Sequence, residues 1–500
     1  MSILVNARQQ TILFLIADTG AGHRSAANAI SNAIKIIAQE KQEASGQPSA
    51  SKTPLLSKAT SGQSQASVRG VQTVSSTIQA SPAASGYRIE IVDVFEEYSR
   101  FPLREAVKLY GPTIRYNPKL FGEVFHRSNR AGTVNAVKSL ATPMILNGLL
   151  RLITSVQPDV IVSIHPMLNH VTVNALEVLG LHIPFLTVVT DLVSVHYAWF
   201  APGVDGYVVP TEQAKKLYLK RGLDPQRVHL LGMPIDPKFT FEVDSKEALQ
   251  QKFGLKPGLP VILLVGGGDG AGGLHNAVRA ISQARLPVQL MVVTGRNKRL
   301  YTSLQRTRAG LHVPLKVFGF VQNMPELMHA SDVIITKAGP GTICEALACR
   351  LPIILSGYVP GQEEGNVDFV TRNEVGVLAM DSATLVDALR HLLMPGSPEL
   401  RRFLEKGARL SHPMASFDIA SFILSQLSSP EEARIWQTPN WQRRKRILSG
   451  RVRSAIRIRR LRRPSSKNLL SREILKNPVV RRISRLRIKR RHYDPTRHLE

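Results

Sequence analysis

The sequence is poor in cysteine and has no hydrophobic run long enough to cross a membrane. Its 500 residues include two cysteines, Cys344 and Cys349. That spacing suits neither zinc ligands nor a disulfide framework, so we expect a reducing compartment. The longest apolar stretch, residues 142–153, is short and contains Arg151, and the first residues do not resemble a signal peptide. We therefore expect no transmembrane helix.

Motifs of several enzyme classes are also missing. G-x-S-x-G, the nucleophile elbow of Ser-His-Asp hydrolases, does not occur. Neither H-x-x-x-H nor H-E-x-x-H occurs, so a metal site is not favoured, although His165, His170, Asp191 and His196 all follow predicted strands. We expect no metal and no cofactor.

Apolar strands alternating with helices dominate what remains. The strands that we predict are residues 12–15, 87–95, 159–164, 184–190 and 206–210 in the first half, and 260–268, 287–295, 314–320, 332–339 and 351–357 in the second. Such alternation is typical of parallel sheets covered by helices, and 500 residues exceed one core. The sequence therefore predicts an α/β protein with two doubly wound domains, whose functional residues lie at the carboxyl ends of the strands.

Composition suggests where the domains end. Residues 41–86 are rich in Ser, Ala and Gln without periodicity, which predicts a disordered insertion. We expect an N-terminal domain over 1–238, a C-terminal domain over 239–428 and a basic tail over 429–500. Residues 441–500 hold 22 Lys and Arg against three acidic residues, so +19 of the formal charge of +28 lies there.

The loop Asp18-Thr19-Gly20-Ala21-Gly22-His23 joins the first strand to a helix predicted from Ser25 to Ile37. A glycine-rich turn before a helix can bind phosphate. However, this loop lacks both the G-x-G-x-x-G spacing and the Lys-Ser/Thr ending of a P-loop, so a tight turn of purely structural origin stays equally open.

Three loops of the second half suit a nucleotide sugar. Glycines crowd residues 265–274, where bare amides suit a diphosphate. In 336–347, Thr342 is a candidate N-cap or phosphate ligand, and Glu345, expected in the first helical turn, either accepts ribose hydroxyls or merely complements the helix dipole. In 357–370, a dense set of acceptors suits a polyhydroxyl ligand, unless it is simply solvated: Gln362, Glu363, Glu364 and Asn366.

Taken in order, these motifs resemble one known family. "DTGAGHRSAANAI", "SIHPML", "VTDLVSVHYAWF", "LLVGGGDGAGG", "TKAGPGTICEAL" and "PGQEEGNV" are similar to the monogalactosyldiacylglycerol synthase and processive diacylglycerol glucosyltransferase group of glycosyltransferase family 28. The resemblance covers about residues 11–380 apart from the insertion. It implies a GT-B fold, a UDP-sugar donor held by the C-terminal domain, a lipid acceptor at the N-terminal domain, and inversion without a metal.

The resemblance also assigns site residues. His23 and Asp191 are the catalytic candidates, and which of them is the base stays open. On the acceptor side it implies His165, His196 and Trp199. Donor contacts are implied for Gly22, Gly267, Gly268, Gly270, Phe320, Val321, Gly339, Gly341, Thr342, Glu345, Gln362, Glu363, Glu364 and Asn366. Ala21 and Tyr197 depart from the plant galactosyl members, which carry Gly and Pro there, and the second change leaves the acceptor open.

The expected reaction is transfer of galactose or glucose from UDP to diacylglycerol at the cytoplasmic face of a membrane. Apolar residues recur among the arginines of the tail, which favours anionic lipid as its partner. Two alternatives stay open: transfer of N-acetylglucosamine to an undecaprenyl-linked precursor, and non-enzymatic nucleic-acid binding. The scarcity of aromatic residues in the tail disfavours nucleic acid.

Overall fold

The computed structural model describes residues 9–17, 21–44, 86–108, 113, 118–129, 131–241, 243–266 and 273–427. Four predicted features lie outside these ranges: residues 18–20 of the first glycine-containing loop, residues 45–85 of the insertion, the glycines Gly267, Gly268 and Gly270, and the tail 429–500. The chain divides into two units, 1–436 and 437–500. All the described residues belong to the first unit.

The first half of this unit forms a parallel sheet of six strands in the order β2-β1-β3-β4-β5-β6. Its inner strands are apolar and fully buried, as a sheet with helices on both faces requires. The strands are β1 (Gln10–Ile16), β2 (Tyr87–Asp93), β3 (Val160–Ser163), β4 (Phe185–Val188), β5 (Gly206–Val209) and β6 (Val228–Leu230).

The second half forms another parallel six-stranded sheet, ordered β12-β11-β10-β7-β8-β9. The two sheets confirm the predicted α/β architecture with two doubly wound halves. The strands are β7 (Val261–Val265), β8 (Gln289–Val293), β9 (Leu315–Phe318), β10 (Val333–Lys337), β11 (Ile353–Gly357) and β12 (Gly376–Leu378).

Helices connect the strands of both sheets. Those of the first half are α1 (Ala21–Ala44), α2 (Val94–Tyr98), α3 (Leu103–Lys108), α5 (Pro118–Ser128), α6 (Ala131–Val156), α7 (Pro166–Leu179) and α8 (Glu212–Lys220), with the short helices η1 (Tyr197–Trp199), η2 (Pro225–Arg227) and η3 (Pro237–Phe239). Those of the second half are α9 (Lys246–Lys252), α10 (Leu274–Gln283), α11 (Lys298–Thr307), η4 (Arg308–Gly310), α12 (Met324–His329), α13 (Pro340–Ala348), α14 (Glu364–Arg372), α15 (Ser382–Leu393) and α16 (Pro398–Leu410), and α17 (Ala415–Ser425) ends the series.

Helix α1 is longer than the sequence predicted. It begins at Ala21, so Gly22 and His23 belong to its first turn rather than to the loop. It also continues to Ala44, four residues into the segment expected to be disordered. Its buried face, which includes Ala26, Ile30 and Ile34, packs on the first sheet, whereas residues 39–44 are exposed or only partly buried.

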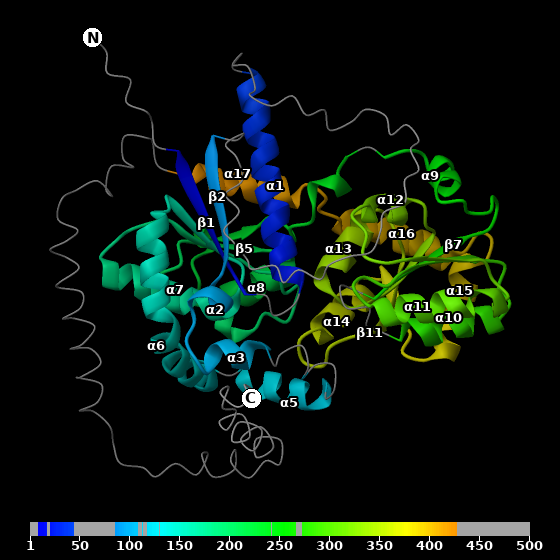
Figure 1. Ribbon diagram of the computed structural model, residues 1–500, viewed down its shortest axis with the longest axis horizontal. Helices are drawn as coiled ribbons and strands as arrows, with labels where there is room; N and C mark the ends of the chain where they lie inside the picture. Colours follow the sequence, from blue (N-terminus) through cyan, green and yellow to red (C-terminus); the bar gives the residue numbers. More distant parts are fainter. Residues whose placement is uncertain are drawn as a thin grey trace, which may run out of the picture. The chain divides into compact units, whose positions relative to one another are not determined.

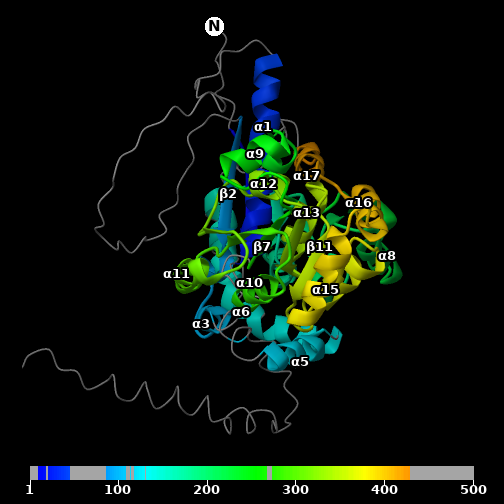
Figure 2. The ribbon, with the colours of Figure 1, turned by 90° about the vertical axis from the view of Figure 1, so that its right-hand side faces the viewer.

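The last helix lies within the segment expected to form the C-terminal domain, residues 239–428, but packs on the first sheet. Helix α17 contacts α1 and lies beside it in both views (Figure 1, Figure 2). Its residues Ile419, Ala420 and Ile423 are fully buried in the core of the first sheet. The chain therefore returns to the N-terminal half, because this apolar helix face finds its partner there.

The order of the strands in each sheet determines where a ligand can bind. In an open parallel sheet, ligands bind where the order of the strands reverses. In the first sheet this point lies between β1 and β3, and in the second between β7 and β10. His23, in the first turn of the helix that follows β1, and His165, after β3, lie near the first point, whereas Gly339 follows β10 at the second.

Specific contacts join the two halves within this unit. Leu192, which follows β4, is buried in a core cluster of the second sheet. A Cβ on Gly365 would lie 2.2 Å from the Ser194 hydroxyl oxygen, so this glycine permits close approach to α14. A Cβ on Gly361 would lie 3.1 Å from Phe125 of α5. The loops after β4 and β11 therefore meet.

Candidate functional site

Two histidines meet at the reversal point of the first sheet. His23 and His165 lie with ring centroids 4.9 Å apart in an edge-to-face arrangement. His165 caps α7: its Nδ1 accepts the Met167 N–H at 3.3 Å, so in the neutral ring the proton sits on Nε2. Burial, and next the neighbouring His23, hold the pKa of His165 well below its ordinary value. His165 therefore stays neutral beside His23.

Asp191 follows β4, and two N–H donors bind its carboxylate. The indole Nε1–H of Trp199 donates to Oδ2 at 2.7 Å, and the His196 backbone N–H donates to the same oxygen at 3.5 Å. Burial raises the pKa of Asp191 to about 6, while both donors oppose this rise. Since both bind Oδ2, Oδ1 is the oxygen available to a substrate.

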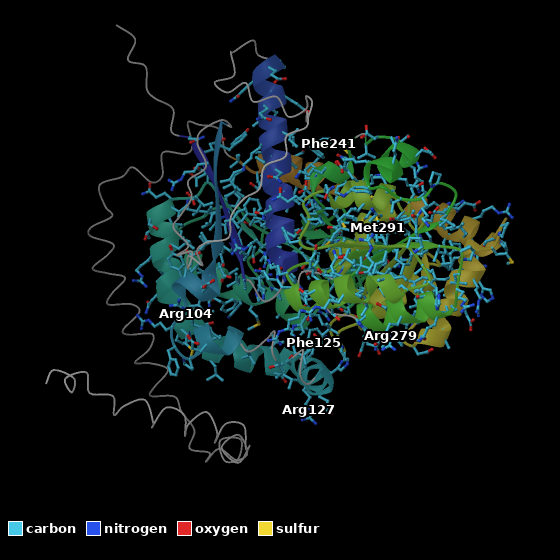
Figure 3. All side chains as sticks on the ribbon, turned by 45° about the vertical axis from the view of Figure 1, so that its right-hand side comes forward. Arg104, Phe125, Arg127, Phe241, Arg279 and Met291 are labelled. Carbon is cyan, nitrogen blue, oxygen red and sulfur yellow. The ribbon has the colours of Figure 1, made fainter. Side chains whose placement is uncertain are left out.

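The two other acceptor-side candidates differ in what they can touch. Trp199 is fully buried and its one polar atom binds Asp191, so it affects the site through that carboxylate rather than by contacting an acceptor. His196 caps η1 by accepting the Ala198 N–H at 3.1 Å, and its ring lies 5.0 Å from that of Phe125. Phe125 belongs to α5, which also carries the exposed Arg127 (Figure 3).

At the reversal point of the second sheet, the turn after β10 leads into α13. Gly339 is the N-cap, so the expectation of Thr342 as N-cap is corrected: the helix already begins at Pro340. Glu345 accordingly lies in the second turn, not the first. Burial, and next the nearby Asp236, raise the pKa of Glu345 to about 7. Hydrogen bonds from hydroxyl donors would stabilise the ionised form of this carboxylate, because they replace the water that burial removes.

The four predicted acceptors lie on the loop after β11 and in the first turn of α14, where side chains among them bind protein groups. Glu363 accepts from the Lys337 ammonium at 2.6 Å and from the Val359 N–H at 2.8 Å. Glu364 accepts from the Gly361 N–H at 2.9 Å and lies 3.3 Å from His126 of α5. These contacts order the loop.

Asn366 and Gln362 complete this group. The Asn366 side-chain amide donates to the Ala338 carbonyl at 2.9 Å, which ties α14 to the turn after β10. Gln362 is partly exposed on the same loop. Each carboxylate oxygen accepts more than one hydrogen bond, so Glu363 and Glu364 retain capacity for sugar hydroxyls.

Phe320 and Val321 follow β9 and differ in exposure. Phe320 is 62% exposed, and the Arg296 guanidinium lies 5.4 Å from its ring centroid. Val321 packs against the core of the second half. The chain after β9 is therefore packed against the core at Val321 and exposed at Phe320.

Gly22 and Gly341 each occupy the second position of a helix, where protein packing does not demand glycine. No heavy atom lies within 4 Å of a Cβ built on either. Glycine in a helix costs about 0.5–1 kcal/mol relative to alanine. Both glycines leave bare amides at helix N-termini, and this arrangement favours an approaching anion.

The site contains residues that the sequence did not single out: Lys337, Asp236, and Phe125 and His126 of α5. Lys337 lies inside the predicted motif 336–347 without being singled out there, but the other three stand outside the strand-end pattern and only their interactions reveal them. Among the described residues, no group of three His, Cys, Asp or Glu side chains could hold a metal ion. Nor does a helix in these ranges have the length and apolar character to span a bilayer.

Two family profiles match the chain in sequence order. The one described as "Monogalactosyldiacylglycerol (MGDG) synthase" matches residues 62–235, and the one described as "Glycosyltransferase family 28 C-terminal domain" matches residues 261–399. The first match includes strands β2 to β6 of the first sheet, and the second includes strands β7 to β12 of the second sheet.

Full-length relatives agree with these profiles. A probable monogalactosyldiacylglycerol synthase 2 from Oryza sativa subsp. japonica is 32% identical over 83% of this chain and 81% of its own length. Monogalactosyldiacylglycerol synthase 3 from Arabidopsis thaliana shows the same identity and the same two coverages.

Solved structures are more distant. MurG from Acinetobacter baumannii is 13% identical, with a TM-score of 0.48 over 83% of this chain and 99% of that one. MnaA from S. aureus is 14% identical, with a TM-score of 0.49 over 84% of this chain and 98% of that one. Values this low carry no inference about substrate. Sequence kinship is sufficient by itself: the chain belongs to the monogalactosyldiacylglycerol synthase family and is a UDP-sugar glycosyltransferase of family 28.

Proposed function

We propose that this enzyme transfers galactose, or else glucose, from a UDP-sugar to the hydroxyl of diacylglycerol with inversion at the anomeric carbon. The observation that carries the proposal is the 32% identity to the Arabidopsis thaliana monogalactosyldiacylglycerol synthase 3 over 81% of its length. The arrangement of the site supports it, because reversal points in two sheets offer one place for a nucleotide and another for an acceptor.

The donor would lie along the second sheet. We assign the ribose hydroxyls to Glu345 and uracil to the backbone at Phe320 and Val321. The diphosphate would lie at the N-terminus of α13, at Gly339, Gly341 and Thr342, and along the glycines 266–273. Gln362, Glu363, Glu364 and Asn366 would face the hexose, with Gly22 approaching from α1.

Asp191 is the residue that we propose as base. A pKa of about 6 suits a group that must be ionised near neutral pH and still accept a proton effectively. Oδ1 would take the proton from the diacylglycerol hydroxyl as its oxygen attacks the anomeric carbon. The bond to the phosphate oxygen breaks, and UDP leaves with the electron pair.

His23 would serve the leaving group. It lies in the first turn of α1, where the helix N-terminus favours negative charge. Adjacent strands lie about 4.8 Å apart, and β3 separates β1 from β4. The segments that follow β1 and β4, on which His23 and Asp191 lie, therefore start about 10 Å apart, a distance that accommodates a sugar ring between them. His23 on the UDP side and Asp191 on the acceptor side match an inverting displacement.

Diacylglycerol dissolves in bilayers, so the enzyme must reach a membrane surface. Exposed apolar side chains occur at Phe101, before α3, at Val124 of α5, and at Val137 and Leu140 of α6. Helices α5 and α6 contact each other, and α5 also carries Arg127. We propose that this region, together with the basic tail, binds anionic lipid peripherally at the cytoplasmic face.

Label transfer tests the proposed reaction. Purified enzyme is incubated with diacylglycerol in anionic vesicles and with radiolabelled UDP-galactose, UDP-glucose or UDP-N-acetylglucosamine, and the lipids are separated by thin-layer chromatography. We expect a labelled glycosyldiacylglycerol from the first or second donor and none from the third. Transfer from neither UDP-galactose nor UDP-glucose contradicts the proposal, whereas N-acetylglucosamine transfer to an undecaprenyl-linked acceptor would support the alternative.

A further inference from the structure

Lys337 is a cation of the second half to which the reaction above assigns no role. It ends β10, where the pairing with β11 shifts register between Thr336 and Lys337. Such an irregularity redirects the side chain that follows it. The Lys337 ammonium lies 2.6 Å from Oε1 of Glu363, whose side chain is only 6% exposed.

The ion pair belongs to a larger clamp, which we define as Lys337, Glu363 and Asn366 with the backbone groups that they bind. The second oxygen of Glu363 accepts the Val359 N–H at 2.8 Å. Asn366 donates to the Ala338 carbonyl at 2.9 Å. Both ends of the loop 359–366 are thereby tied to the end of β10.

The clamp adjoins the turn that begins α13. A Cβ on Gly339 would lie 3.8 Å from the Lys337 ammonium nitrogen, so the lysine passes next to this turn. The carboxylate of Glu363 is thus held in one orientation by a cation on one oxygen and an amide on the other. Each oxygen keeps a lone pair that can accept a further hydrogen bond.

We propose that Lys337 is a positioning residue that sets the preference between donor sugars by fixing Glu363. Galactose and glucose differ in the direction of a single hydroxyl group. A site rejects the wrong isomer strongly only where the polar group that reads the hydroxyl cannot move to follow it. This inference rests on the proposed function for the assignment of Glu363 to the hexose.

The competing role for Lys337 is direct contact with the donor diphosphate. A lysine in that role would strengthen binding of UDP and of every UDP-sugar alike. A lysine that acts through Glu363 leaves UDP binding unchanged and alters only the contribution of the sugar. The two roles therefore predict opposite results for UDP.

The experiment is calorimetric titration of the full-length protein with UDP, UDP-galactose and UDP-glucose. Variants are Lys337→Met, Lys337→Arg and Glu363→Gln, with Lys252→Met as matched control because Lys252 forms a 2.9 Å ion pair with Glu326 elsewhere in this half. Diacylglycerol is omitted, so an error in the proposed acceptor cannot affect the outcome. The transfer assay separately tests the proposed function.

We expect wild type to prefer one UDP-sugar, and Lys337→Met and Glu363→Gln to reduce that preference by ~10-fold or to unity, with UDP affinity within ~2-fold of wild type. Lys337→Arg, which keeps the charge, should restore most of the preference, and Lys252→Met should preserve all of it. If Lys337→Met fails to fold, Glu363→Gln decides. Equal affinity of wild type for both sugars, an unchanged preference in the variants, or a large loss of UDP binding in Lys337→Met each overturns the inference.

Discussion

Replacing Trp199 by Phe tests whether Asp191 is the base. The substitution removes the indole N–H that donates to Asp191 Oδ2 at 2.7 Å and keeps an aromatic ring in the buried site. A hydrogen bond to an ionised group stabilises it by about 1.5–3 kcal/mol. One pKa unit corresponds to about 1.36 kcal/mol, so loss of this bond should raise the pKa of Asp191 by about 1–2 units.

The expected change is large enough to measure. Asp191 has a pKa of about 6. Such a group is about 90% ionised at pH 7, whereas a pKa of about 7–8 leaves about 10–50% ionised. If the carboxylate form is required, the acid limb of kcat/KM should move up by about 1–2 pH units, because that limb reports the free enzyme.

The assay is a pH profile of kcat/KM for sugar transfer between pH 5 and 9, together with thermal unfolding. Tyr207→Phe is the matched control, since it removes a buried hydrogen bond of 2.6 Å to the Ala201 carbonyl in the same half. Both variants should lose stability, but only Trp199→Phe should shift the acid limb. An acid limb that coincides with wild type in Trp199→Phe would refute Asp191 as the titrating base.

Three further predictions concern His23, Glu345 and Tyr218. His23→Ala should lower kcat by ~10²-fold or more with little change in Tm if His23 assists UDP departure; an equal loss of stability would indicate a packing role instead. Glu345 has a pKa of about 7, so it is protonated at pH 6 and ionised at pH 8. If the ionised form binds ribose, UDP affinity measured by calorimetry should rise by ~5- to 10-fold across this interval in wild type and stay flat in Glu345→Gln; the same slope in both would contradict the assignment. The Tyr218 hydroxyl is buried without a hydrogen-bond partner among the described residues, a state that costs about 1–3 kcal/mol. Tyr218→Phe should therefore leave the free energy of unfolding unchanged or raise it, and a clear fall in denaturant titrations would count against this account.

Local pattern was sufficient to predict most strands. Strands such as Val261–Val265 are continuous apolar runs, because parallel strands are buried on both faces. The edge strands Val228–Leu230 and Gly376–Leu378 were not predicted, since three residues are too few to show a period. Helix bounds were also less accurate: α1 begins at Ala21 and ends at Ala44, and residues 39–44 are almost all exposed, so no buried face marks them in the sequence.

The candidate site residues also combine features that the sequence predicts with features that only the folded structure decides. His23, Asp191, Glu345 and Glu363 stand out in the sequence because each follows a strand, and parallel strands bring such positions to one edge. What each side chain can do was decided by contacts between segments distant in the chain. For example, the indole N–H of Trp199 donates its hydrogen bond to the Asp191 carboxylate.

Long-range contacts also placed elements that no local pattern could locate. Helix α17 joins the first sheet although it comes after the second in sequence, and α5 reaches the loop after β11 through Phe125 and His126. Neighbouring residues along the chain are enough to locate the long, continuously apolar strands and the polar or glycine-rich residues that follow them. Partners, burial and the pKa values of Asp191 and Glu345 came from the folded arrangement, because these depend on side chains that folding brings together from distant segments.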